Sequence, residues 1–241
     1  MLTLVLALAS LITALLSGVF GMAGGMLLMG VYTAVLPVPT AMVMHGGTQL
    51  VSNVSRAVLL IRHVYWAGFR FYVLGAVVAF AALYSVQLVP HPLLVFLGLG
   101  LAPFVAPLMP ASLSDFERPR TAAITGFLVV AVQLIAGAAG PLLDVAFLNT
   151  RLTRQQVVAT KAVTQIFSHG LKLAYFIPAL ERGLISPSLL MAVLVATVCG
   201  TRLGTYALTR MSDAAFRRYS RWIVYTIGAA YLCRAGLVML P

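Results

Sequence analysis

The sequence predicts an all-α integral membrane protein with two inverted repeats, each a glycine-broken re-entrant hairpin followed by three transmembrane helices. Three observations support this prediction. Of the 241 residues, 61% are hydrophobic and only 9% are Asp, Glu, Lys or Arg, whereas soluble domains carry roughly 25% charged residues. One polar helix face occurs twice, and charged and neutral connections follow a pattern along the chain. The alternative is eight simple transmembrane helices with parallel halves.

Eight segments are long and apolar enough to cross a bilayer, which requires about 20 mostly apolar residues. They are 2–36, 41–61, 70–89, 92–109, 121–148, 157–178, 187–209 and 220–240. The first and the fifth are longer than a single span. We therefore expect the first repeat at 1–110, a connecting loop at 111–119 and the second repeat at 120–241.

Glycines interrupt the first and fifth segments at corresponding places. The interruptions read GMAGG and GAAGP and are related by an offset of 116 residues, so Gly24 falls on Gly140. Gly25, however, falls on Pro141. Broken backbone within a membrane is tolerated only where it is buried in protein or faces water. Such discontinuous helices often form binding sites at membrane depth.

The segments after the two interruptions carry the same polar stripe. With the same offset, 41–56 (AMVMHGGTQLVSNVSR) aligns with 157–172 (VVATKAVTQIFSHGLK). The polar positions follow the spacing i, i+3, i+4, i+7, i+8, i+11, which places them on one helix face. Polar faces in so apolar a chain indicate a polar pathway between the halves. The matched pairs are His45 and Lys161, Thr48 and Thr164, Gln49 and Gln165, Ser52 and Ser168, Asn53 and His169, and Arg56 and Lys172.

Loop charges favour the inverted arrangement. Arginines occur near 62–70, 110–120, 149–156 and 210–221, and the nearly neutral connections are 37–40, 90–92 and 179–187. If each broken segment returns to its own side, all four charged connections share one side, as the positive-inside rule requires. Three spans then follow each hairpin, and an odd number of spans inverts the second half. The rule also explains the net charge of +11 without a nucleic-acid partner.

The first half carries a resemblance to a known family. The glycine-rich segment SGVFGMAGGMLLMGVYTAVLPVP precedes a helix with the pattern A-x-x-x-H-x-x-T-Q-x-x-S-N. This combination resembles the TauE/SafE family of sulfite and organosulfonate exporters, within the toluene-sulfonate uptake permease group. The pattern returns, weakened, in the second half, where Pro141 departs from the expected glycine run. The resemblance implies a multi-pass transporter for a small sulfur-containing anion in the bacterial inner membrane.

An oxyanion site needs positive charge and several hydrogen-bond donors, with no carboxylate nearby. Neither stripe contains Asp or Glu, so the pattern suits an anion and argues against a metal-cation pathway. The candidate binding residues are Thr48, Gln49, Ser52, Asn53, Thr164, Gln165, Ser168, His169 and the backbone of Gly24, Gly25 and Gly140. For the hydroxyl side chains, the alternative is that they bond their own backbone or join helices together.

Four basic side chains of the stripes, His45, Arg56, Lys161 and Lys172, are candidates for attracting or gating the anion. Arg56 lies 11 residues after His45, or about 16 Å along a helix, so we expect that one small anion cannot touch both. Because Arg56 and Lys172 lie near the ends of their helices, snorkelling to the interface is the alternative interpretation for both.

Asp144 is the carboxylate that lies inside an apolar segment. It is a candidate for ion coupling. The interpretation that we favour is pairing with a basic residue such as Lys161 or Arg151. Arg202 and Arg234, which also lie within apolar segments, are further candidates for its partner or for interface anchors.

The predicted function is secondary transport of a sulfite- or sulfonate-type anion, by alternating access at a site between the repeats. A channel or a transporter subunit for another small anion is the alternative. An intramembrane enzyme is disfavoured because no H-E-x-x-H, paired carboxylates or G-x-S-x-G occurs. His45 and His169 lack a third metal ligand, so we expect no metal or cofactor. The expected partners are the anion and the lipid bilayer, and a homo-oligomer is compatible with the sequence.

Overall fold

The computed structural model describes residues 2–20, 23–180, 183, 185–208, 210 and 213–239. Gly21 and Met22, in the first glycine interruption, lie outside the described residues. The described part of the chain is helical and contains no strand. Its α-helices are α1 (Leu2–Phe20), α2 (Ala23–Val35), α3 (Val38–Leu60), α4 (Trp66–Val86), α5 (Pro92–Val105), α6 (Pro119–Ala136), α7 (Gly140–Val145), α8 (Arg154–Phe176), α9 (Pro187–Leu208) and α10 (Asp213–Met239).

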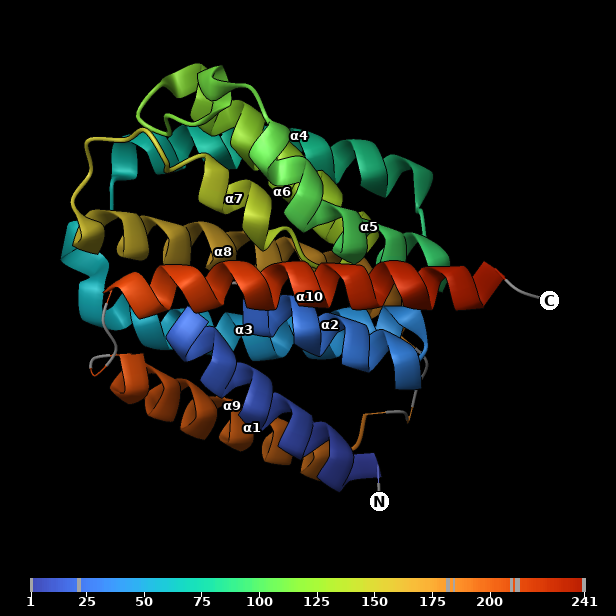
Figure 1. Cartoon of the computed structure of the whole chain (residues 1–241). Coiled ribbons are helices and arrows are strands. Elements are labelled where there is room, and N and C mark those ends of the chain that lie inside the picture. The colour runs from blue at the N-terminus through green and yellow to red at the C-terminus, as the bar shows by residue number, and fades with distance from the viewer. Residues whose placement is uncertain are drawn as a thin grey trace.

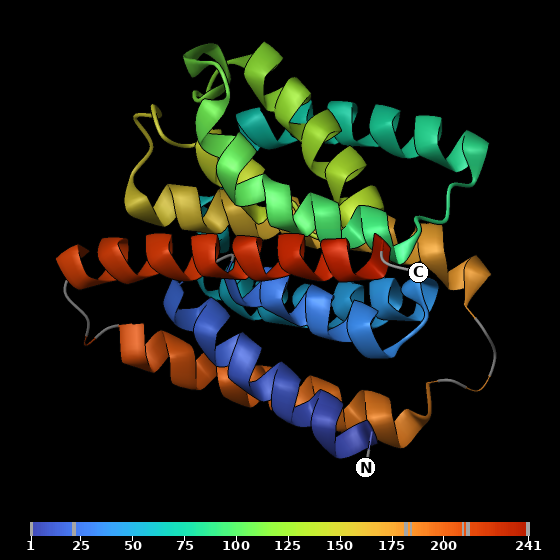
Figure 2. The same ribbon diagram turned by 45° about the vertical axis from the view of Figure 1, so that its right-hand side comes forward.

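Several helices have the length and composition of membrane spans. The candidates are α4, α6, most of α9 and the Trp222–Met239 part of α10, and α1, α2 and α5 contain shorter apolar segments. Both α3 and α8 have 23 residues, about 34 Å of helix, which is enough to cross a bilayer. Their polar stripes lower their hydropathy, and both helices lie in the middle of the bundle in Figures 1 and 2.

The helix bounds agree with the expected segments except near the C-terminus. The first and fifth segments are each divided into two helices, α1 with α2 and α6 with α7. The last helix, in contrast, begins at Asp213, so the connection expected at 210–221 is shorter than predicted. Arg217, Arg218 and Arg221 lie in the first turns of α10 because arginine is a good helix former and does not end a helix by itself.

The offset found in the sequence recurs in the helices. α3 and α8 begin at residues 38 and 154 and end at 60 and 176, which is the same offset of 116 residues at both ends. α1 and α6 also end with this offset, at 20 and 136. The packing also relates the two halves. α1 of the first half packs on α9 of the second, and α6 of the second half packs on α4 of the first. α3 and α8, which correspond by the offset, pack on each other.

Each broken segment turns back on itself. On α1 and α2, the Tyr32 hydroxyl lies 2.7 Å from Ser10 Oγ, and Gly24 lies against the backbone of Thr13, so the two helices run antiparallel. After α7, the Ala146 carbonyl accepts a hydrogen bond from Phe116 N at 2.9 Å. The chain has therefore returned to the connection from which α6 began.

The connections lie at two opposite ends of the bundle (Figures 1 and 2). The turn from α3 to α4, the segment between α5 and α6, and the segment between α7 and α8 lie at the left, as do the end of α9 and the start of α10. The turns from α2 to α3 and from α4 to α5 lie at the right, with the end of α8. The arginine-containing connections thus share one end.

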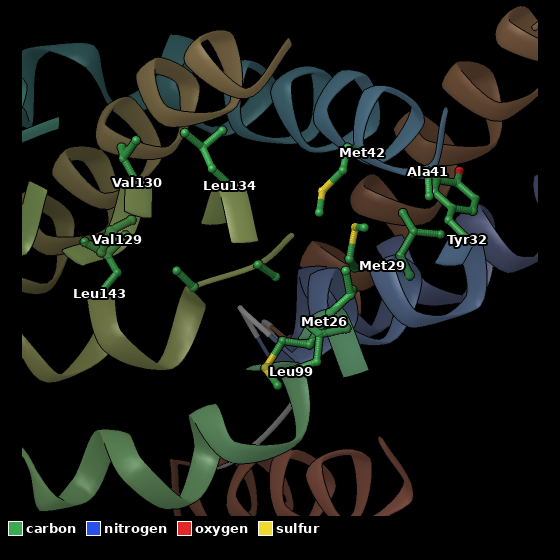
Figure 3. Close-up of a cluster of buried hydrophobic side chains, with 14 of the residues drawn as sticks. Met26, Met29, Tyr32, Ala41, Met42, Leu99, Val129, Val130, Leu134 and Leu143 are labelled. Atoms are coloured by element: carbon green, nitrogen blue, oxygen red, sulfur yellow. The ribbon is translucent and has the colours of Figure 1, made fainter. Parts of the chain in front are cut away.

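A methionine-rich core fixes the position of α2 (Figure 3). Met26 and Met29 on α2, Met42 on α3 and Leu99 on α5 are buried together. On the other side of this core lie Val129, Val130 and Leu134 of α6 and Leu143 of α7. Methionine adapts to irregular gaps, which suits a core where two short helices end between longer ones.

Replacing Gly204 with Leu should destabilise the protein, because α1 and α9 are in backbone contact there. A Cβ at Gly204 would lie 2.2 Å from the Leu15 carbonyl oxygen, so the helices must separate, at a cost of ~2 kcal/mol or more. The matched control is Gly236→Leu on α10, where nothing lies within 4 Å of a new Cβ. Thermal unfolding in detergent measures both; equal melting temperatures would contradict the packing described.

Candidate functional site

The two polar stripes face each other across an antiparallel contact between α3 and α8. Asn53 Nδ2 donates to Gln165 Oε1 at 3.0 Å, and the His45 and His169 rings meet edge to face with centroids 5.5 Å apart. The start of α8 is fixed by a capping box in which Thr153 bonds reciprocally with the third helical residue. Residues near the start of α3 thus contact residues near the end of α8.

A small cavity lies where the stripes meet the two interrupted helices. Its volume is about 20 Å³, close to what a single water molecule needs. No Asp or Glu lines it, and the described residues contain no group of three or more His, Cys, Asp or Glu that could hold a metal ion. The polar lining residues are Ser17, His45, Gln49, Arg56, Gln133, Gln165 and His169, and the other lining residues are Gly25, Met26, Val129, Ala138, Ala139 and Gly140.

Arg56 lies beside this cavity without an acidic partner. Its Nη2 donates to Ser52 Oγ at 3.0 Å and to Ser17 Oγ at 3.5 Å, so the side chain extends back along α3, the direction that helical side chains favour. Its Nε is buried and has no hydrogen-bond partner. The distance expected between Arg56 and His45 along the helix separates their backbones. Their side chains nevertheless line the same cavity.

The two matched glutamines also line the cavity. Gln165 is oriented by the bond from Asn53, whose amide nitrogen also donates to the Gln49 carbonyl at 2.8 Å. Gln49 lies over Gly25, where an added Cβ would come within 3.2 Å of Gln49 Oε1. The glycine at the start of α2 therefore leaves room for the glutamine side chain.

The four hydroxyl residues of the stripes bond helix backbone or neighbouring helices, and of the four Ser52 also accepts the hydrogen bond from Arg56, which lines the cavity. Thr48 and Thr164 each donate to a carbonyl three residues earlier, at 2.9 Å. Ser168 donates to the Thr164 carbonyl and lies 2.5 Å from the Tyr72 hydroxyl, and Ser52 lies 3.1 Å from Thr201 Oγ1. These contacts fit the alternative interpretation, in which the hydroxyls bond helix backbone and join neighbouring helices.

Lys172 is fully buried and does not extend to the interface. Its Nζ lies 2.9 Å from His45 Nδ1, donates to the Gly137 carbonyl at 2.8 Å and contacts the Met29 sulfur at 3.7 Å. Gly137 has φ of +82°, a conformation that favours glycine, and this turn directs its carbonyl toward the amine. Lys172 thus connects α8 to α2, α3 and the end of α6.

Asp144 is paired with Lys161, which is the interpretation that the sequence favours. Its Oδ1 accepts a hydrogen bond from Lys161 Nζ, and neither side chain lines the cavity. The carboxylate is about half exposed, whereas Arg202 and Arg234, the other candidate partners, are exposed. Of the four basic stripe residues, Lys161 therefore lies apart from His45, Arg56 and Lys172.

Two cavity residues were not among the candidates predicted from the sequence. Ser17 lies on α1 and Gln133 on α6, and Gln133 Nε2 is 3.4 Å from His169 Nδ1. Both precede the glycine interruptions, and they are themselves 116 residues apart. The repeat offset is the sequence signal that relates them, because it extends to positions before the interruptions.

Comparison with known proteins gives one match. A model of the family described as sulfite exporter TauE/SafE matches residues 6–231, which include both interruptions, both stripes and every residue that lines the cavity. The searches of curated proteins and of solved structures found no match. The apolar helices of the described residues agree with the membrane location of such an exporter. Because the match covers nearly the whole chain, this membrane protein belongs to the sulfite exporter TauE/SafE family.

Proposed function

We propose that the protein is a secondary transporter that binds a sulfite- or sulfonate-type anion in the cavity between α3 and α8. The observation that carries this proposal is the Arg56 guanidinium, whose buried Nε lacks a partner beside a cavity without carboxylates. A buried donor without a partner costs free energy. An oxyanion would supply both the missing acceptor and the missing negative charge.

The other lining groups suit the same ligand. Sulfite and sulfonate groups are compact and have strong acceptor oxygens, and Gln49, Gln133 and Gln165 carry amide donors. Residues at the start of α2, Gly25 and Met26, also line the cavity, and the first turn of a helix favours negative charge. The expectation that Thr48 and Ser52 contact the anion is not part of the proposed site, since their hydroxyls have other partners.

We propose alternating access between two inverted repeats. The shared offset of the helices and the exchange of packing partners, α1 with α9 and α6 with α4, support two related halves. The α6–α7 segment returns to the end at which it began, as a re-entrant hairpin would. Because the cavity is barely larger than one water molecule, the halves must move apart to admit an anion, which favours a gated transporter over an open channel.

We infer that the chain lies in the bacterial inner membrane with its arginine-rich connections in the cytoplasm. The cell interior is negative, and each 100 mV adds about 2.3 kcal/mol per charge to the outward movement of an anion. Export therefore requires no ATP-driven partner. The family is one of exporters, so we propose transport and not catalysis.

The topology can be tested by thiol labelling of single cysteines. After Cys199 and Cys233 are replaced with Ser, we expect Val89→Cys, in the connection between α4 and α5, to react with a membrane-impermeant maleimide on intact cells. Ser112→Cys, between α5 and α6, should react only after permeabilisation. Both positions are exposed. If Ser112→Cys is labelled as readily as Val89→Cys on intact cells, the proposed orientation is wrong.

Arg56→Gln should reduce transport of sulfite, sulfoacetate, taurine or thiosulfate into proteoliposomes, whichever the wild-type protein carries. The loss of a charged donor costs about 1.5–3 kcal/mol of anion binding, or roughly 10- to 100-fold in affinity. Arg202→Gln, an exposed arginine outside the cavity, is the matched control and should transport normally. Transport of none of the four anions by the wild-type protein would refute the proposed function.

The double substitution Gln49→Ala and Gln165→Ala should raise the KM for the transported anion. Each amide contributes about 1 kcal/mol if it donates to the anion, so the combined effect is roughly 10- to 30-fold. The double substitution Thr48→Ala and Thr164→Ala is the matched control, because those hydroxyls bond their own helices. Unchanged kinetics in the glutamine variant would exclude the glutamines from the site.

A further inference from the structure

Three buried basic side chains form a cluster, and not all of them face the anion cavity. Lys172, His45 and His169 are 0%, 1% and 4% exposed. Lys172 does not line the cavity, whereas both histidines do. His45 is therefore the side chain that connects the cavity to the buried amine, because it faces the one and bonds the other.

The hydrogen bonds of His45 determine where its proton lies. Its Nε2 is 2.9 Å from the Gly25 carbonyl oxygen, and a carbonyl only accepts, so Nε2 carries a hydrogen. Its Nδ1 is 2.9 Å from Lys172 Nζ. Two nitrogens at this distance share one hydrogen between them. A proton can pass from one to the other without movement of the heavy atoms.

The surroundings of Lys172 accommodate two protonation states. A charged ammonium has three hydrogens, and its three contacts are the Gly137 carbonyl, His45 Nδ1 and the Met29 sulfur. A neutral amine has two hydrogens, which still serve the carbonyl and the imidazole, and only the weak sulfur contact is lost. The pair can therefore gain or lose one proton while its strong hydrogen bonds remain.

The titratable groups around the pair add positive charge and no negative charge. His169 faces His45, and Arg56 lines the same cavity. The other titratable side chains on the packed helices have partners of their own or are exposed: Lys161 with Asp144, Tyr72 with Ser168, Tyr32 with Ser10, Tyr231 with the α2 backbone, and the exposed Arg62, His63 and Arg202. A proton on the pair therefore has no counterion within the described residues that line the cavity.

We propose that Lys172 and His45 bind one proton that crosses the membrane together with the anion. This proposal rests on the proposed function, since the anion in the cavity would be the missing counterion. Attraction between the two ligands makes the binding of each strengthen the binding of the other, by the same factor. Ligands that bind together move together. An exchange mechanism, in contrast, would require them to exclude each other.

The proton balance is simple. Water on one side of the membrane supplies a proton through His45, an N–H bond forms on the pair, and the bond breaks when the proton returns to water on the other side. A monovalent anion then crosses without net charge, so the anion and proton gradients set its direction and the membrane potential no longer acts on it. A divalent anion still carries one negative charge, on which an inside-negative potential acts in the outward direction.

The decisive experiment uses proteoliposomes of the whole protein with a pH-sensitive dye inside. Sulfoacetate and thiosulfate are suitable probes because they stay ionised near neutral pH and cannot carry the proton themselves. We expect an imposed anion gradient to move protons in the same direction as the anion, in a ratio near one. Anion transport by the wild-type protein without proton movement would overturn the coupling and leave the proposed function intact. Absence of both movements would overturn the proposed function and the coupling with it.

Variants locate the coupling site. Lys172→Gln should retain exchange of labelled for unlabelled anion across the membrane, while its proton-to-anion ratio falls about tenfold or more. The matched control is Lys161→Gln, which removes a lysine outside the cavity and should stay coupled. Proton movement by Lys172→Gln in the wild-type ratio would exclude Lys172 as the site. If this variant does not fold, the wild-type ratio still decides whether a proton is coupled, and His45→Gln decides whether the pair carries it.

Discussion

The structure depends on the burial of two polar helix faces against each other. In the hydrocarbon of a bilayer, an exposed amide, imidazole or guanidinium has no water to bond, and its exposure costs several kcal/mol. The antiparallel contact of α3 and α8 removes both faces from lipid at once, and the Asn53 to Gln165 bond joins them directly. The remaining helices can be apolar because they surround this pair and carry none of its polar groups to the membrane.

The polar contact leaves two basic side chains without a carboxylate partner, and the proposed function depends on this feature. Arg56 and Lys172 occupy equivalent positions of the two stripes, yet no carboxylate faces either one among the described residues that line the cavity. The carboxylate of Asp144 is bound instead to Lys161. Buried positive charge without a counterion favours the binding of an external anion. The two basic groups differ: Arg56 has a donor without a partner, whereas the Lys172 amine is bonded to the His45 imidazole.

Sequence periodicity predicted the helices well and the side-chain contacts less well. The offset between the stripes gives the bounds of α3 and α8, because helix bounds follow local pattern. It could not show that Thr48 and Thr164 bond their own backbones, since hydroxyls have that choice at every helical position. Nor could spacing along a helix axis show that the long Arg56 side chain lines the same cavity as His45. Ser17 and Gln133 are related by the same offset, but they precede the interruptions and do not belong to a polar stripe.

The packing of α1 on α9, a helix of the second half, has a consequence for the synthesis of the chain. α1 leaves the ribosome before the other described helices, and it packs on α9, which begins at Pro187. The first half therefore cannot complete its own contacts while it is being synthesised. α1 must wait in the membrane, or beside the insertion machinery, until α9 has been synthesised. Assembly of this fold is for that reason a late event, and a half-length product would lack the surface that its first helix requires.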